Sequence, residues 1–170
     1  NFLREMNARH LWQPMGHPGD MQANAPTIIN GAEGVEIIDL DEHRVVDAVG
    51  GLWCVNLGYS NDVVKQAISD QLWQLPDYSA FAGCSNPAAI EASYAVQEFF
   101  AEDGMAREFF TSGGSDAVDT ALRMARQYHR LRGEPTRTKF LSLKKGYHGT
   151  HWGGASVNGN TRFRIDCEPL

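Results

Sequence analysis

Residues 108–116 read Glu108-Phe109-Phe110-Thr111-Ser112-Gly113-Gly114-Ser115-Asp116. Their apolar start is typical of a short buried strand, and the pattern that follows Asp116 predicts a helix to about Leu131. A second apolar run covers residues 139–143. Because a strand, a helix and a strand in succession form a right-handed parallel unit, we expect an α/β fold with a mostly parallel sheet.

Cap and turn residues predict the other elements. Asn61 is a typical N-cap, and Asn86 followed by Pro87 is a second helix start. Two β-branched runs separated by polar residues indicate a β-hairpin. Prolines and glycines are closely spaced from Pro14 to Gly19 and oppose regular structure. We therefore expect helices over 62–75 and from 87 to about 101, a hairpin over 35–39 and 44–47, and irregular chain over 1–33.

The composition argues against several classes of partner. Fifteen Lys and Arg against 21 Asp and Glu give a net charge of −6, which opposes binding to nucleic-acid phosphates. No apolar run approaches the ~20 residues needed to cross a bilayer. Cys54, Cys84 and Cys167 lack the spacing of a disulfide framework or a zinc site and suit free thiols in a reducing compartment. We expect a cytoplasmic protein without nucleic-acid, membrane or metal binding.

The turn that precedes the 116–131 helix suits an anion. The first amides of a helix have no acceptor within it, and the helix dipole places partial positive charge there. Gly113 and Gly114 let the backbone approach a ligand, and Ser115 adds a hydroxyl donor, so a phosphate is the expected ligand. The carboxylates of Asp116 and Asp119 must then point away. The alternative is a capped helix start with no ligand, because no GxGxxG or GxxxxGK[ST] motif is present.

A second glycine-rich stretch, residues 144–149, follows the second apolar run. In a parallel unit it lies near the first turn, since ligands bind outside the carboxyl ends of the strands. Tyr147 and His148 are the candidates to stack on a planar ring there. The alternative is an aromatic side chain that closes the end of the sheet.

Taken together, these stretches resemble the class III aminotransferases, which are fold-type I enzymes dependent on pyridoxal phosphate (PLP). The resemblance covers roughly residues 10–165. It is carried by residues 113–120, 146–149 and 51–59, by the hairpin that ends at Asp47, and by Asn86-Pro87. Residues 52–56, Leu52-Trp53-Cys54-Val55-Asn56, are similar to the ω-amino acid and amine:pyruvate branch of the class.

The resemblance implies a cofactor site. Gly114 and Ser115 would hold the cofactor phosphate, and Tyr147 would stack on the pyridine face. Gly113 stands where the family commonly has Ser, and Asp116, near the ring, stands where it commonly has Glu. The implied cofactor-binding residues are Gly113, Gly114, Ser115, Asp116, Tyr147 and His148.

The resemblance also implies a substrate pocket lined by Trp53, with Met15 and Phe81 nearby. Phe81 is a candidate to reach the partner subunit's site in a homodimer or a dimer of dimers. The alternatives are Trp53 as part of a core and Phe81 as surface packing.

The implied activity is transfer of an amino group from an amine or ω-amino acid to a keto acid such as pyruvate. Residues 1–60 would form an N-terminal segment with the hairpin, and residues 61–170 the start of a large PLP-binding domain, which is incomplete. The family's Schiff-base lysine, and the aspartate that pairs with the pyridine nitrogen, lie downstream of the tyrosine motif. We therefore expect the N-terminal portion of an aminotransferase, with no catalytic residue of its own and no activity in isolation.

Two other functions stay open at this point. One is another PLP activity, such as an aminomutase or a decarboxylase, because the residues present hold the cofactor and not the reacting bond. The other is a non-catalytic α/β module that binds a nucleotide or another phosphate at residues 112–116.

Overall fold

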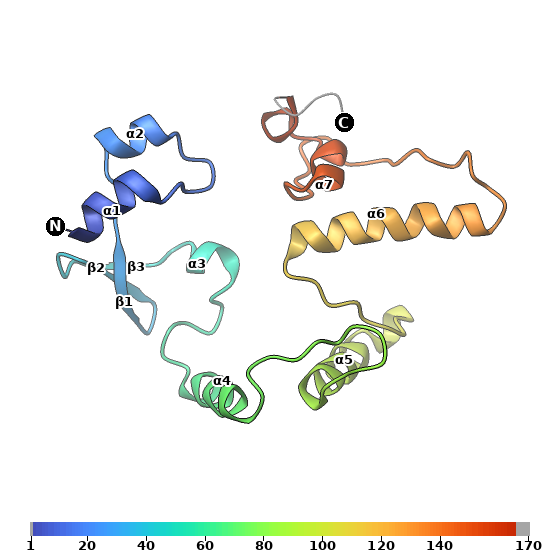
Figure 1. Cartoon of the computed structure of the whole chain (residues 1–170), viewed down its shortest axis with the longest axis horizontal. Coiled ribbons are helices and arrows are strands. Elements are labelled where there is room, and N and C mark those ends of the chain that lie inside the picture. Colours follow the sequence, from blue (N-terminus) through green and yellow to red (C-terminus); the bar gives the residue numbers. More distant parts are fainter. Residues whose placement is uncertain (1, 166–170) are drawn as a thin grey trace. The chain divides into compact units, whose positions relative to one another are not determined.

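The computed structural model describes residues 2–165 as parts of two compact units, of which the first ends at Ser79 and the second begins at Ala80 (Figure 1). The expected boundary at residues 60 and 61 separates an N-terminal segment from a cofactor-binding domain. It concerns a functional division and stays a prediction.

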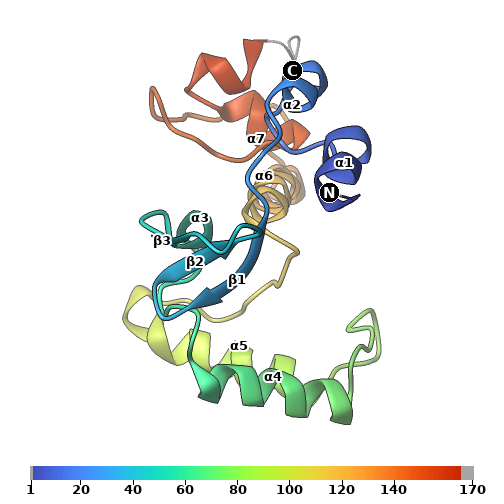
Figure 2. The same cartoon turned by 90° about the vertical axis from the view of Figure 1, so that its left-hand side faces the viewer.

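A small antiparallel sheet organises the first unit. Its strands are β1 (Ile29–Glu33), β2 (Glu36–Asp39) and β3 (Arg44–Val46), in that order across the sheet (Figure 2). In the middle strand, Ile37 lies opposite Ala32 of β1 and opposite Val45 of β3. The predicted hairpin is confirmed as β2 and β3.

Four helices accompany this sheet in the first unit: α1 (Phe2–His10), α2 (Pro18–Ala23), α3 (Gly50–Trp53) and α4 (Asp62–Gln74). The helix expected over 62–75 is confirmed as α4. Its cap is the predicted one, because the Asn61 side chain accepts a hydrogen bond from Val64 N at 3.1 Å.

The prediction of irregular chain over residues 1–33 is wrong, because α1, α2 and β1 all form there. The closely spaced prolines and glycines begin only at Pro14, after α1 has ended. Within α1, Glu5 and Arg9 pair across one turn at 3.1 Å. β1 includes Asn30 and Gly31, which are poor strand formers, and it is a strand because β2 supplies its ladder.

The second unit is helical in the part that the structure describes. Its elements are α5 (Pro87–Phe99), η1 (Ala101–Asp103), α6 (Gly114–Leu131), α7 (Trp152–Val157) and η2 (Thr161–Phe163). Asn86 caps α5 as predicted, accepting from Ala89 N at 2.9 Å. The helix expected from residue 116 is confirmed as α6, which begins two residues earlier, and α6 packs against α7.

The expected mostly parallel sheet is absent from residues 2–165. The strands found there are antiparallel and lie in the first unit. The segments expected to form its strands, residues 108–111 and 139–143, carry no ladder. A strand exists only through hydrogen bonds to a neighbour. Within the described chain these two apolar segments have no such neighbour.

Little apolar surface is buried within the described residues. Met21 and Ala155 are the buried hydrophobic side chains, and Asn158 is the buried polar one. On α4, Val64, Ile68 and Leu72 follow one another at helical spacing, and all three are exposed. None of the helices described is both long and apolar enough to span a bilayer.

Candidate functional site

The N-terminus of α6 presents unused backbone donors. Gly113 precedes the helix with extended backbone (φ −179°, ψ 177°) and supplies no side-chain cap. The first helical hydrogen bond runs from Ala117 N to Gly113 O at 3.0 Å. Among residues 2–165, no acceptor bonds the amides of residues 114–116. A Cβ built on Gly113 or Gly114 would meet nothing within 4 Å, so an anion can approach these amides directly.

The two glycine-rich stretches meet at Ser115. Thr150 N donates a hydrogen bond to Ser115 Oγ at 3.1 Å. Gly149 adopts a φ of +101°, and a Cβ there would lie 2.8 Å from Ser115 Oγ and 2.9 Å from Ser115 Cα. Only glycine therefore fits at residue 149. Because the Ser115 oxygen already accepts from Thr150, its hydroxyl hydrogen is available to an outside acceptor.

The acidic side chains at the start of α6 are engaged by the segment around α7. Asp116 Oδ1 lies 3.0 Å from Nδ1 of His151. Asp119 accepts from the backbone amides of Gly154 at 2.8 Å and Gly153 at 3.3 Å, at the start of α7. Both carboxylates next to the open amides of α6 therefore have partners of their own in the segment around α7.

Tyr147 is 56% exposed, and its ring packs edge-on against Phe163, with centroids 5.1 Å apart and planes at 69°. His148 is half-buried, and its Nε2 atom is buried with no hydrogen-bond partner among the described residues. Its backbone amide donates to Oδ1 of Asn158 at 2.5 Å. Residues 144–150, called the Tyr147 segment below, therefore have a backbone held by hydrogen bonds and carry an accessible aromatic ring.

Sequence reasoning missed Thr150 and Asn158, which hold this segment in place. Thr150 acts through its backbone amide, which no sequence pattern identifies. Asn158 precedes Gly159, a pair that ordinarily predicts an exposed turn. In the structure its side chain is fully buried.

The expected substrate-binding residues are exposed. Met15 and Trp53 belong to the first unit and Phe81 to the second. Trp53 is 85% exposed and Phe81 84%. The alternative of Trp53 as a core residue is therefore not met in the described chain, while its place in a pocket stays a prediction.

Trp53 ends a left-handed turn that Asp47 holds. The φ values are +58° at Gly50, +60° at Gly51, +64° at Leu52 and +70° at Trp53. Asp47 Oδ2 accepts from Gly51 N at 2.7 Å, and its Oδ1 accepts from Val49 N at 3.2 Å. A left-handed conformation costs about 1–2 kcal/mol for a residue with a side chain. The hydrogen bonds of Asp47 therefore help to hold the turn before Trp53 in its left-handed conformation.

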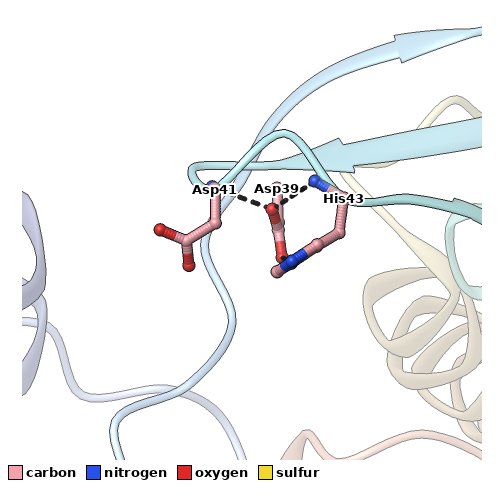
Figure 3. A group of neighbouring side chains, drawn as sticks. All are labelled: Asp39, Asp41 and His43. Atoms are coloured by element: carbon pink, nitrogen blue, oxygen red, sulfur yellow. Dashed lines mark hydrogen bonds and ion pairs between the residues drawn. The ribbon is translucent and has the colours of Figure 1, made fainter.

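Asp39, Asp41 and His43 form a group in the turn between β2 and β3 (Figure 3). Asp39 Oδ1 accepts from Asp41 N at 2.8 Å and from His43 N at 2.9 Å, and His43 Nδ1 lies 3.0 Å from its Oδ2. The hydrogen bond with His43 lowers the pKa of Asp39 and raises the pKa of His43. Asp41 pairs with Arg4. These bonds explain the group as the closure of a turn.

Residues 19–170 match the family model described as Aminotransferase class-III. The chain belongs to this family. It is 40% identical over 150 residues to the putrescine–pyruvate aminotransferase of Pseudomonas aeruginosa, a match that covers 88% of this chain and 33% of the relative. It is 34% identical over 155 residues to the omega-aminotransferase of Caulobacter vibrioides, covering 91% of this chain and 35% of the relative.

A solved structure agrees with these relatives. An amine transaminase from an uncultivated Pseudomonas species, in its PLP-bound form, matches 95% of this class III chain with a TM-score of 0.90 and 44% identity. The match covers 36% of that chain. The class III chain thus spans about a third of the length of the relatives it matches and has the fold of that part of a fold-type I aminotransferase. The predicted family is confirmed.

Proposed function

We propose that this chain contributes the phosphate-binding turn and the ring-stacking segment of a PLP-dependent aminotransferase. The observation that carries the proposal is the contact between the α6 N-terminus and the Tyr147 segment through Ser115. Open amides, a hydroxyl with its hydrogen available and an accessible aromatic ring come from stretches of chain that touch. A phosphorylated planar ring is the ligand class that uses all three.

The residues present fit PLP. Its phosphate would accept hydrogen bonds from the amides of residues 114–116 and from the Ser115 hydroxyl, beside Gly113 and Gly114. Tyr147 would cover one face of the ring and exclude water from it, next to His148. When bound, PLP supplies the electron sink for chemistry at the amino carbon, while the protein orients it. Asp116 is proposed to lie near the ring, and its bond to His151 would hold its carboxylate in one orientation.

The proposed reaction moves an amino group from an amine or ω-amino acid to a keto acid such as pyruvate. The relatives that carry the names putrescine–pyruvate and beta-alanine–pyruvate aminotransferase support this class of donor and acceptor. Trp53 is proposed as a wall of the donor pocket, with Met15 nearby.

Further proposals concern the assembly and the cell compartment. We propose a homodimer or a dimer of dimers in which Phe81 contributes to the partner subunit's site, and a cytoplasmic location. The thiol of Cys54, which is exposed and donates to Gly51 O, is consistent with a reducing compartment.

The test uses the full-length protein that carries these residues. It is purified and examined for the visible absorbance of bound PLP. It is then supplied with putrescine or β-alanine and with pyruvate, and alanine formation is measured. Alanine produced in proportion to donor consumed supports the proposal. A protein without PLP that binds nucleotides at residues 112–116 would instead favour the phosphate-binding module, and PLP with carbon dioxide release or amino-group migration would favour a decarboxylase or aminomutase.

A further inference from the structure

Asn158 is the one completely buried polar side chain among residues 2–165. Its carboxamide bridges two peptide groups, the one between Tyr147 and His148 and the one between Gly149 and Thr150. Oδ1 accepts from His148 N at 2.5 Å, and Nδ2 donates to Gly149 O at 2.9 Å. A neutral side chain with one donor and one acceptor at this separation is required, and a carboxamide meets that requirement.

The backbone around Asn158 fits the same segment closely. Gly159 N donates to Gly146 O at 3.0 Å, and a Cβ on Gly159 would lie 2.0 Å from Leu143 O. Arg164 donates to the Asn158 carbonyl at 3.2 Å. The stretch from Leu143 to Gly149 thus wraps around Asn158 and Gly159 and leaves no space for a side chain at residue 159.

This wrapped segment joins the two halves of the proposed cofactor site. The first of the two bridged peptide groups contains the carbonyl of Tyr147, and the second contains the amide of Thr150. Thr150, directly after Gly149, donates its amide to Ser115 Oγ. A shift of these two peptide groups therefore both moves the stacking ring and breaks the contact with the phosphate-binding turn.

We propose that Asn158 is a positioning residue for the cofactor, which fixes the spacing between the Tyr147 ring and the Ser115 hydroxyl before the cofactor binds. The proposal rests on the proposed function, since it takes the ligand to be PLP. Among the described residues Asn158 forms no hydrogen bond to either group, and it acts through the backbone of residues 147–150.

The experiment measures the dissociation constant of PLP by fluorescence titration of the full-length apoprotein. The variants are Asn158→Ser, Tyr147→Ala and both together, with Asn160→Ser as the matched control. Asn160 is a nearby asparagine whose side chain, among residues 2–165, accepts only from Arg162 N in its own turn. Loss of the Asn158 bonds is expected to weaken PLP binding about tenfold, and loss of the ring about 2- to 10-fold.

The test of the positioning role is whether the effects of Asn158→Ser and Tyr147→Ala on the dissociation constant of PLP are independent. If Asn158 acts by placing Tyr147, the double variant binds PLP no more than about twofold weaker than Asn158→Ser alone, because the misplaced ring has little left to lose. Asn160→Ser leaves the dissociation constant unchanged. Losses that multiply in the double variant, or an equal loss in Asn160→Ser, would overturn the positioning role while leaving PLP binding by the wild type intact.

A measurement on the wild type covers the case in which the Asn158 variants do not fold. Hydrogen exchange of the His148 and Thr150 amides is followed with and without PLP. Both amides should already be protected in the apoprotein, because Asn158 and Ser115 are their acceptors. Amides that become protected only after PLP is added would overturn the proposal. A wild-type protein that binds no PLP would overturn the proposed function itself.

Discussion

The Tyr59 hydroxyl donates a 2.5 Å hydrogen bond to Oδ2 of Asp47, the oxygen that also accepts from Gly51 N. The Tyr59 bond is the main cause that lowers the pKa of Asp47, and the Gly51 amide lowers it further. The same bond raises the pKa of Tyr59. One carboxylate thus links the end of β3, the left-handed turn that carries Trp53 and the segment that follows it.

The Asp47–Tyr59 bond predicts a pH-dependent contribution to stability. Because the folded pKa of Asp47 is lowered, its contribution is present above the ordinary value of 3.8 and is lost as the pH falls through the folded value. Because the folded pKa of Tyr59 is raised, its contribution is present below 10.0 and is lost as the pH rises through the folded value. We expect Tyr59→Phe to lower the Tm between about pH 5 and 9, with a smaller difference from wild type at either extreme.

Tyr94→Phe is the matched control for this series. Tyr94 lies on α5 with an exposed ring and no hydroxyl partner among the described residues. Its Tm should follow the wild type at every pH. If the Tm of Tyr59→Phe stays below that of the wild type by the same amount down to pH 3, Asp47 is not the group whose titration causes the pH dependence.

The exposed Trp53 at the end of the left-handed turn predicts an effect on donor choice. Trp53→Ala should enlarge the proposed pocket and raise kcat/KM for a bulky amine relative to a small one, since specificity is a difference in transition-state binding. Asp47→Asn should shift the ratio in the same direction but less, because it loosens the turn and keeps the ring. The ratio of kcat/KM for 1-phenylethylamine to that for putrescine measures both effects, and Trp73→Ala, which removes an exposed tryptophan from α4, is the control. An unchanged ratio in Trp53→Ala would place its ring outside the pocket.

The open surface at Gly114 predicts a variant that loses the phosphate without losing the fold. Apart from its chain neighbours and its own helix, no described protein atom lies within 4 Å of a Cβ at Gly114, so the first carbon of a valine side chain there occupies open space beside the amides. Combined with Ser115→Ala, Gly114→Val should weaken PLP binding by about 1.5–3 kcal/mol for the lost hydroxyl bond, and further through obstruction. Equilibrium dialysis of the full-length double variant against PLP is the measurement. Binding of pyridoxal, which has no phosphate, should weaken less than binding of PLP, and by no more than the loss of the Thr150–Ser115 bond causes. Wild-type affinity for PLP in the double variant would show that the phosphate binds elsewhere.

Local signals in the sequence were sufficient for the caps and the hairpin. Asn61 and Asn86 cap α4 and α5 because an asparagine before a helical pattern satisfies an amide three residues on, and that rule needs no tertiary partner. The hairpin followed from β-branched runs of the right length. The contact between the two glycine-rich stretches was expected from a parallel unit, and it is present although residues 108–111 and 139–143 carry no ladder.

Features that depend on distant partners were missed. β1 is a strand through β2 and not through its own residues, and α7 begins where Asp119 of α6 supplies acceptors to its first amides. The burial of Asn158 results from the wrapped segment at 143–149 and leaves no periodic pattern. The sequence therefore indicated which residues are candidates to bind the phosphate and the ring. It did not indicate the hydrogen bonds of Thr150 and Asn158 that fix the positions of these candidates relative to one another.

The lysines of this chain predict that residues 1–170 alone will not form a Schiff base with PLP or transaminate. A Schiff-base lysine needs surroundings that keep its amine neutral, together with a position within bonding reach of the cofactor aldehyde. The lysines are Lys65, Lys139, Lys144 and Lys145, and all four are exposed. Lys144 and Lys145 adjoin the proposed ring site, but their backbone belongs to the segment wrapped around Asn158 and Gly159.

The measurement is the visible spectrum of the 1–170 chain with PLP before and after borohydride, followed by mass mapping and an assay of amine turnover. We expect scattered or no reduced adducts and no turnover. A single reduced lysine together with turnover would show that the catalytic lysine is one of these four.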